Sequence, residues 1–241
     1  MPQFQEIQAI LFDAVGTLIH PDPPAALVYA EVGRRHGSRR AVADIRQRFA
    51  AAFAREEAFD LAHGLRTSEE REVCRWRCIV RDVLDDVTDA DACFEELYRH
   101  FSLPGAWRCE PEVAMVLETL DRRGYTLGLA SNYDHRLRSV AAGLPALGPL
   151  RHLIISSEVG WRKPAPEFFA TAATWLRLPL KDILIIGDDR VNDYDGGRAV
   201  GSQTVLLDPD GEEPDAVRIA RLAELIDLFE GEDHDDFGGL P

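Results

Sequence analysis

Residues 10–18 read Ile-Leu-Phe-Asp-Ala-Val-Gly-Thr-Leu, a short apolar run that ends in an aspartate and is followed by a glycine turn. This pattern is typical of a buried strand that delivers one carboxylate, Asp13, into a loop. Comparable apolar runs occur further along the chain, at residues 126–130, 153–155, 183–186 and 204–207. Polar or turn residues bound each run, so we expect all of these segments to be buried parallel strands.

Helical patterns lie between the apolar runs. Apolar residues repeat with the spacing i, i+3, i+4, i+7 at Val113, Val116, Leu117 and Leu120, and Gly124 follows where a C-terminal helix cap belongs. Strand and helix therefore alternate, which predicts an α/β fold built on a doubly wound parallel sheet.

One long segment interrupts this alternation. Residues 25–101 are rich in alanine and arginine and contain no strand-like run, so they are expected to form about four helices. Turn-forming residues are concentrated on both sides of the segment, at 20–24 and 102–105. Paired connections of this kind suit an inserted lid that moves against the rest of the protein.

The pattern therefore predicts two domains. The expected boundaries are a core of residues 1–19 and 106–230, an all-helical cap of residues 20–105, and a tail of residues 231–241. The tail is acidic, and its composition predicts disorder.

Composition limits the classes of function. The chain is 46% hydrophobic and 29% charged, which indicates a soluble globular protein, and the absence of a long apolar run or leader pattern predicts a cytoplasmic location. A formal net charge of −15 argues against nucleic acid or an anionic membrane as a partner. We expect a small, anionic substrate, held by a metal ion or a few positioned cations. The sequence leaves the oligomeric state open.

Reactive side chains follow the apolar runs. In an open α/β sheet the ligand site lies beyond the carboxyl ends of the strands, so these side chains are expected to meet. In chain order they are Asp13, then Ser131 and Asn132, then Lys163 at the end of a loop, then Asp188, Asp189 and Asp193.

A carboxylate at this position can act as a nucleophile and form a covalent intermediate. Asp13 and Asp188 would repel each other unless a cation lay between them, and hard oxygen ligands suit Mg²⁺. Lys163 would neutralise charge on the nucleophile and the transferring group. Ser131 would donate a hydrogen bond to that group, with Asn132 also binding it.

Three further residues are expected to support the site. Asp193 orients Lys163 or metal-bound water. Asp189 is either a neighbour of the metal ligands or a plain turn residue, and Thr17 follows the nucleophile in the same loop.

At this point the chain resembles the haloacid dehalogenase (HAD) superfamily over nearly its whole length. The segments Leu129-Ala-Ser-Asn132, Gly160-Trp-Arg-Lys-Pro164 and Gly187-Asp-Asp-Arg-Val-Asn-Asp193 are similar to the second, third and fourth motifs of that superfamily. The resemblance implies a Rossmann-like core and a helical cap of the C1 type. It also implies a Mg²⁺ ion whose coordination is completed by the backbone carbonyl of Val15. Residues 131–137 and the Gly-Trp-x-Lys-Pro signature at 160–164 are most similar to the group called haloacid dehalogenase-like hydrolase domain-containing protein 3.

The sequence departs from this pattern at Val15. In the phosphatases of the superfamily, the residue two positions after the nucleophile is an aspartate that protonates the leaving oxygen and later activates water. Valine can do neither, and general acid–base catalysis is worth about 10²- to 10⁴-fold in rate. Two features could compensate for the missing aspartate. One is a leaving group that departs without protonation, and the other is a general acid supplied by His20, Asp22 or His135.

Three activities within the superfamily tolerate a non-acidic residue here. The first is a Mg²⁺-dependent hydrolase of a small phosphorylated metabolite. The second is a metal-independent 2-haloacid dehalogenase, whose halide departs unprotonated, although such enzymes lack the acidic pair Asp188 and Asp189. The third, a phosphonatase, needs a lysine in the cap, and the chain's only lysines, Lys163 and Lys181, lie outside it. A protein that binds Mg²⁺ and a phosphorylated ligand with little turnover is the non-enzymatic alternative.

Overall fold

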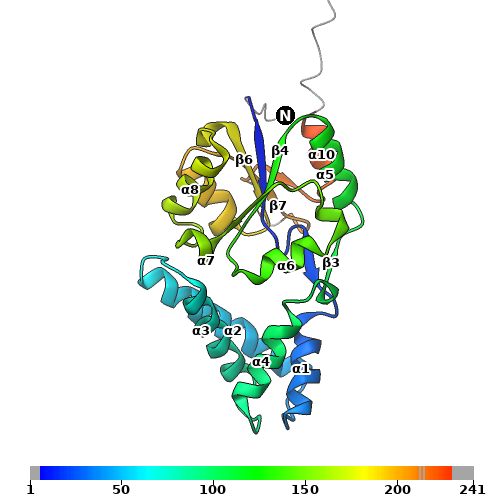
Figure 1. The fold of residues 1–241 in the computed structure, drawn as a ribbon, viewed down its shortest axis with the longest axis vertical. Helices are drawn as coiled ribbons and strands as arrows, with labels where there is room; N and C mark the ends of the chain where they lie inside the picture. Colours follow the sequence, from blue (N-terminus) through cyan, green and yellow to red (C-terminus); the bar gives the residue numbers. More distant parts are fainter. Residues whose placement is uncertain (1–5, 212, 214, 230–241) are drawn as a thin grey trace, which may run out of the picture.

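The computed structural model describes residues 6–211, 213 and 215–229. The predicted acidic tail, residues 231–241, lies outside the described residues. Figure 1 shows a sheet with helices on both faces and, below it, a separate group of helices.

The sheet confirms the predicted doubly wound α/β fold. Its six strands have the order β5-β4-β1-β6-β7-β8, and every neighbouring pair is parallel. The five long strands match the apolar runs of the sequence. The strands are β1 (Ala9–Phe12), β4 (Thr126–Ser131), β5 (His152–Ile155), β6 (Ile183–Gly187), β7 (Gln203–Leu207) and β8 (Arg218–Ile219).

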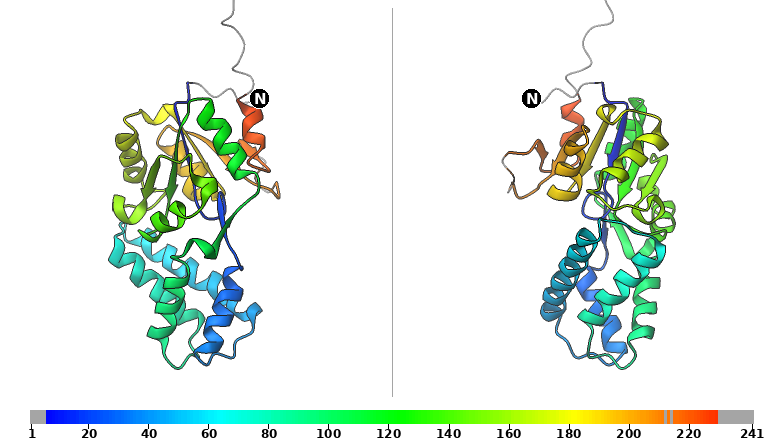
Figure 2. Two further views of the ribbon diagram at one scale, coloured as in Figure 1. Left: turned by 45° about the vertical axis from the view of Figure 1, so that its right-hand side comes forward. Right: turned by 90° about the vertical axis from the view of Figure 1, so that its left-hand side faces the viewer.

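Helices cover the two faces of the sheet, as Figure 2 shows from two sides. Successive residues of β1 point to opposite faces, so Ile10 and Phe12 join one hydrophobic cluster and Leu11 joins another. The first cluster includes residues of α5 (Val113–Arg122), α6 (Arg136–Ala142) and α10 (Glu224–Leu228). The second includes residues of α8 (Pro166–Leu176). The predicted cap residue of α5, Gly124, has a positive φ of 90°.

Short helical turns complete the connections between the strands. They are η1 (Pro104–Ala106), η2 (Pro145–Leu147), α7 (Ser156–Val159), η3 (Leu180–Asp182), η4 (Arg190–Asp195) and α9 (Gly196–Ala199).

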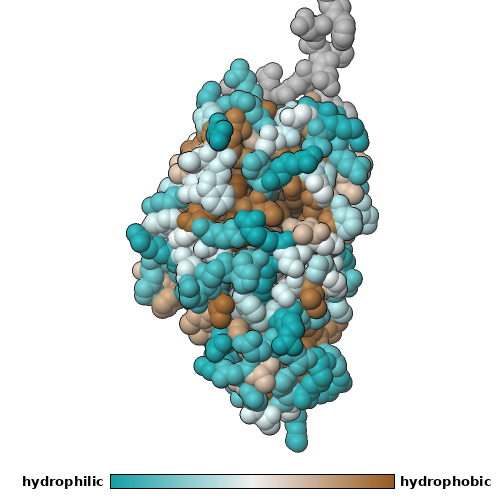
Figure 3. Space-filling view, in the orientation of Figure 1, coloured by the Kyte–Doolittle hydropathy of each residue, from teal (hydrophilic) through white to brown (hydrophobic). Residues whose placement is uncertain are grey.

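Four helices within residues 25–100 form the lower part of Figure 1. We call them the cap helices: α1 (Ala25–Arg35), α2 (Val42–Ala62), α3 (Glu69–Val83) and α4 (Ala90–His100). They share a hydrophobic cluster of their own. The side chains of Ser68 and Asp89 accept hydrogen bonds from backbone amides and so fix where α3 and α4 begin. In Figure 3, hydrophilic residues dominate the outer surface of this part, with a few apolar residues among them.

A short antiparallel ribbon joins the two parts. Strand β2 (Ile19–Pro21) leads into the cap helices and β3 (Trp107–Cys109) leads out of them. These strands pair Ile19 with Cys109 and Pro21 with Trp107, so the two crossings lie side by side. Among the described residues, no helix has both the length and the hydropathy needed to span a bilayer.

Candidate active site

The reactive residues meet at the carboxyl ends of the central strands. Asp13 follows β1, Ser131 ends β4 and Asp188 follows β6, and β1 pairs with both neighbours. All three line a pocket of about 390 Å³, whose opposite wall comes from the cap helices. The pocket also contains Val15, Asn132, Lys163, Asp189 and Asp193. Of the predicted site residues, Thr17 alone is not among those that line the pocket.

Lys163 is the centre of the polar cluster. Its side chain is 2% exposed, and its Nζ donates to Oδ1 of Asp13 at 2.7 Å, to the carbonyl of Ala130 at 2.7 Å and to Oδ1 of Asp193 at 2.5 Å. Burial alone would lower the pKa of Lys163, but the two carboxylates outweigh that effect and raise it. The lysine is therefore a fixed ammonium beside the nucleophile.

Asn132 holds the backbone of Lys163. Its Nδ2 donates to the carbonyl oxygen of Lys163 at 3.0 Å, and its Oδ1 accepts from the amide of Lys163 at 2.7 Å. Both polar ends of the Asn132 side chain are thus engaged by the main chain of the lysine. This geometry gives Asn132 a positioning role.

Asp188 approaches the loop that carries the nucleophile. Thr17, which is 1% exposed, donates from Oγ1 to Oδ1 of Asp188 at 2.9 Å. Gly16 has a φ of 99°, and a Cβ at this position would lie 2.2 Å from a carboxylate oxygen of Asp188, so only glycine fits. Desolvation and the neighbouring Asp13 carboxylate raise the pKa of Asp188 to about 6. Two carboxylates held this close favour a bound cation.

Asp189 and Asp193 have different surroundings. Asp189 caps η4, because its Oδ1 accepts from the amides of Val191 and Asn192 at 2.9 and 2.8 Å. This is the arrangement of a turn residue. Asp193 is 1% exposed, and while its Oδ1 binds Lys163, its Oδ2 accepts from the amide of Asp189 at 3.3 Å. Asp193 therefore positions the lysine from behind.

The residues present fit a Mg²⁺ ion. Each of Asp13, Asp188 and Asp193 offers a carboxylate oxygen, and these oxygens lie within 4.8 Å of one another. An all-oxygen donor set with open space on the pocket side is the kind that Mg²⁺ takes, because this ion retains several waters. Both carboxylate oxygens of Asp193 already accept hydrogen bonds, one from Lys163 and one from the amide of Asp189, so Asp13 and Asp188 are the better candidates for direct ligands.

The pocket offers Val15 where an acid would be expected. Val15 is 36% exposed and lies on the pocket wall. The candidate substitutes His20, Asp22 and His135 are not among the described residues that line the pocket. His20 lies in β2 near Glu110, and His135 is bound to Glu69 of α3.

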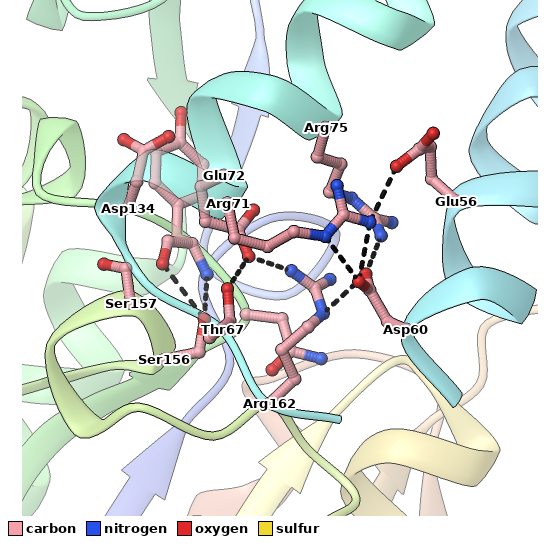
Figure 4. Close-up of polar contacts among 12 residues, drawn as sticks. Glu56, Asp60, Thr67, Arg71, Glu72, Arg75, Asp134, Ser156, Ser157 and Arg162 are labelled. Atoms are coloured by element: carbon pink, nitrogen blue, oxygen red, sulfur yellow. Dashed lines mark hydrogen bonds and ion pairs between the residues drawn. The ribbon is translucent and has the colours of Figure 1, made fainter. Parts of the chain in front are cut away.

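A buried ion network joins the cap helices to the loop that carries Lys163. Arg162, 4% exposed, donates from Nη1 to Oε1 of Glu72 at 2.5 Å, and the same oxygen accepts from Thr67 at 2.7 Å. Arg162 also lies 3.6 Å from Asp60, which Arg75 contacts as well. Figure 4 shows these side chains converging from α2, α3 and the loop. The residue directly before Lys163 is therefore fixed by the cap helices.

Backbone pairing reinforces this junction. Thr67 donates its amide to the carbonyl of Gly160 at 3.1 Å, and the amide of Arg162 donates to the carbonyl of Leu65 at 2.9 Å. Between them Arg66 and Trp161 form an antiparallel bridge. The cap helices are thus anchored at this junction as well as at the β2/β3 ribbon.

Sequence reasoning missed the other wall of the pocket. Seven aromatic rings, four of them from the cap helices α1, α2 and α3, line the pocket together with Glu57 and Arg136. The rings are scattered over more than one hundred positions and share no spacing, so their only signal is the aromatic content of the insert. The rings belong to Tyr29, Phe49, Phe53, Trp76, Phe101, Trp107 and Tyr133.

The chain is similar to a known family and to known proteins along most of its length. The family described as haloacid dehalogenase-like hydrolase matches residues 7–201. A Homo sapiens protein named haloacid dehalogenase-like hydrolase domain-containing protein 3 is 30% identical, with 94% of this chain and 96% of that protein covered. A phosphoserine phosphatase of Thermus thermophilus is 25% identical, with 92% of this chain and 98% of that protein covered.

Solved structures share the fold. The L-2-haloacid dehalogenase of Xanthobacter autotrophicus superimposes with a TM-score of 0.73 at 15% identity. The superposition covers 94% of this chain and 99% of that one. At this identity the likeness concerns the architecture, including the helical segment inserted after the first strand.

Proposed function

The chain belongs to the haloacid dehalogenase-like hydrolases, and within that family we propose that it is a Mg²⁺-dependent phosphohydrolase acting on a small phosphorylated molecule. The observation that carries this proposal is the pair Asp13 and Asp188, whose carboxylate oxygens lie close together beside the buried Lys163. In a site without a metal ion, a second carboxylate next to the nucleophile would be unfavourable, because the two negative charges repel each other.

The proposed reaction has two displacements. A carboxylate oxygen of Asp13 attacks phosphorus, the bond from phosphorus to the leaving oxygen breaks, and that oxygen departs with the electron pair. Water then attacks the phosphorus of the aspartyl phosphate, which releases inorganic phosphate and restores Asp13. Mg²⁺, held by Asp13, the Val15 carbonyl and Asp188, would supply neutralisation of charge on the phosphoryl oxygens.

The surrounding residues take defined roles in this proposal. Lys163 is a permanent positive charge beside the nucleophile, and stabilises the negative charge of the transferring group. Ser131, 3% exposed at the end of β4, donates a hydrogen bond to the same group. Asn132 and Asp193 hold Lys163 by its backbone and side chain, and Thr17 holds Asp188.

The domain division predicted from the sequence belongs to the same proposal. Residues 1–19 and 106–230 would form the catalytic core, and residues 20–105 the cap that closes the pocket. The position of the cap helices over the carboxyl ends of the strands supports this division.

Related proteins support phosphate as the group transferred. The chain is similar along most of its length to a protein named phosphoserine phosphatase. A dehalogenase is the second candidate, favoured by Val15 and by the shared fold. Against it, a 2-haloacid carries a carboxylate, and each cationic side chain among the described residues of the pocket already has a carboxylate partner.

The test is a side-by-side assay of p-nitrophenyl phosphate and L-2-chloropropionate, with Mg²⁺ and with EDTA, using Asp13→Asn as the blank. We expect release of p-nitrophenol that EDTA abolishes and that the blank lacks. Chloride release that survives EDTA would establish the dehalogenase instead. Absence of both products, together with calorimetric Mg²⁺ binding, would favour the ligand-binding alternative.

A further inference from the structure

The aromatic rings of the pocket form a continuous series that runs from the cap helices to the core. Tyr29 contacts Phe49 edge-to-face at a centroid distance of 5.3 Å, and Phe49 stacks on Phe53 at 6.1 Å. On the other side Tyr29 contacts Phe101 at 6.2 Å. The series extends to Trp76 at one end and, through Trp107, to Tyr133 at the other. A pocket of about 390 Å³ has room for a phosphate and a ring system of modest size.

The positive charges of the pocket are already neutralised. Arg136 is 5% exposed, and its Nε and Nη2 donate to the two oxygens of Asp134 at 2.8 and 2.7 Å. Arg162 is bound by Glu72, and Lys163 by Asp13 and Asp193. These three are the cationic side chains among the described residues that line the pocket.

This charge distribution limits the substrate. With Lys163 beside the nucleophile, the outer pocket has no cation left for a second phosphate or a carboxylate. Glu57, which also lines the pocket, would repel a second anionic group of the substrate. Burying an anion without a partner is strongly unfavourable. The pocket therefore favours a substrate whose part beyond the reacting phosphate is uncharged.

Val15 limits the leaving group in a separate way. Without an acid at this position, the leaving oxygen departs as an anion. A phenol has a pKa of about 10, whereas the pKa of an alkyl alcohol is much higher and close to that of water. Phenolate therefore departs far more readily when nothing protonates it.

We propose that the substrates are aryl phosphates, phosphate monoesters of uncharged phenols, with the aromatic leaving group seated against the ring series of the cap helices. This inference rests on the proposed phosphohydrolase function and names its substrate class. In the first displacement the phosphorus–oxygen bond breaks, the aryloxide takes the electron pair, and it gains a proton from solvent after release.

The experiment compares kcat/KM of the full-length protein with Mg²⁺ on four compounds that separate the ring from the leaving group. 2-Naphthyl phosphate has a ring and a phenolate leaving group, and acetyl phosphate has an activated leaving group without a ring. Benzyl phosphate has a ring and an alkoxide leaving group, and ethyl phosphate has neither feature. Asp13→Asn provides the blank for spontaneous hydrolysis.

We expect kcat/KM for 2-naphthyl phosphate to exceed that for acetyl phosphate by at least about tenfold. We expect kcat/KM for benzyl phosphate to be at least about a hundredfold below that for 2-naphthyl phosphate. Turnover of acetyl phosphate that equals or exceeds that of 2-naphthyl phosphate would overturn the aryl specificity while leaving the phosphohydrolase intact. Benzyl phosphate turned over as fast as 2-naphthyl phosphate would show that the protein supplies an acid, and would also overturn the inference. No turnover of any compound would remove both proposals.

A matched pair of variants tests the ring series itself. Phe53→Leu replaces a ring of the pocket wall by an aliphatic side chain, and Phe59→Leu makes the same change on the same helix at a residue that is 48% exposed and outside the pocket. We expect the preference for 2-naphthyl over acetyl phosphate to fall about threefold to tenfold in Phe53→Leu only. The ratio is independent of the fraction of folded enzyme. An equal ratio of the two kcat/KM values in both variants would contradict binding of the leaving group against the rings. Trp76→Leu tests a second ring of the series in the same way.

Discussion

The Nζ of Lys163 lies 2.7 Å from Oδ1 of Asp13, although the two residues are 150 positions apart in the chain. The loop after β5 brings the lysine to the carboxyl end of β1, where Asn132 and Asp193 fix it from two directions. The ammonium and the nucleophile therefore form one buried unit before any substrate arrives. Such preorganisation avoids reorganisation during the reaction.

Replacing this lysine tests its role. Lys163→Met removes the charge that faces both Asp13 and Asp193, so we expect kcat for an aryl phosphate to fall by about 10²-fold or more. The matched control is Lys181→Met, at the chain's only other lysine, whose side chain is 72% exposed. We expect the control to stay within about twofold of the parent protein. A folded Lys163→Met protein with kcat within tenfold of the parent would contradict the assignment.

Restoring the acid tests what Val15 has removed. Val15→Asp places a carboxyl group on the pocket wall, and we expect kcat/KM for benzyl phosphate to rise by about tenfold or more. Val191→Asp makes the same change at a residue that is 60% exposed and outside the pocket, and should give no gain. A Val15→Asp protein without a gain would mean that the pocket, and not only the acid, differs from that of an alkyl phosphatase.

The raised pKa of Asp188 predicts a pH dependence of metal binding. The pKa is about 6, so the carboxylate is charged above this pH and takes up a proton below it. Mg²⁺ must displace that proton, and its affinity should fall about tenfold for each pH unit below the pKa. Calorimetric titration of Mg²⁺ between pH 5 and pH 8 measures this. Asp188→Asn should bind weakly at every pH, and a flat profile in the parent protein would contradict the prediction.

The Arg162–Glu72 pair predicts strong coupling between the cap helices and the core loop. Both side chains are at most 5% exposed, so Glu72→Gln leaves a buried guanidinium without its main partner. Removing one partner of a buried pair typically costs about 3–5 kcal/mol of unfolding free energy. Urea unfolding of Glu72→Gln, Arg162→Met and the double variant gives the coupling energy.

The pair Arg138–Glu158 provides the reference for that cycle. Both residues belong to the part of the protein that contains the sheet, and their side chains are 51% and 24% exposed. Surface ion pairs of this kind contribute about 0–1 kcal/mol to stability. A coupling energy for Arg162 and Glu72 no larger than this reference would show that the junction contributes little to stability.

The sheet could be predicted from sequence because strands buried on both faces are continuously apolar. The runs at residues 10–12 and 183–186 correspond to β1 and β6, and the reactive residues follow directly after them. The expectation that Asp13 and Asp188 lie near each other needed only the rule that parallel strands share a carboxyl edge. The fold prediction is therefore a consequence of local composition.

Features that depend on distant partners could not be predicted. Asn132 binds the backbone of a residue 31 positions later, and nothing in its neighbourhood indicates this. Arg162 and Glu72 are 90 positions apart, on elements whose packing the pattern does not specify. The ribbon of β2 and β3 escaped notice because each strand has three residues and β2 ends in proline.

The pairing of Ile19 with Cys109 means that the inserted helices begin and end at one point of the core. In evolutionary terms such a segment is a cassette, since insertions whose ends lie close together are tolerated by the host domain. A gene could lengthen, shorten or exchange it while the sheet still folds. The nucleophile would then be inherited unchanged, and new substrates would be acquired by mutations confined to the codons between Pro21 and Trp107.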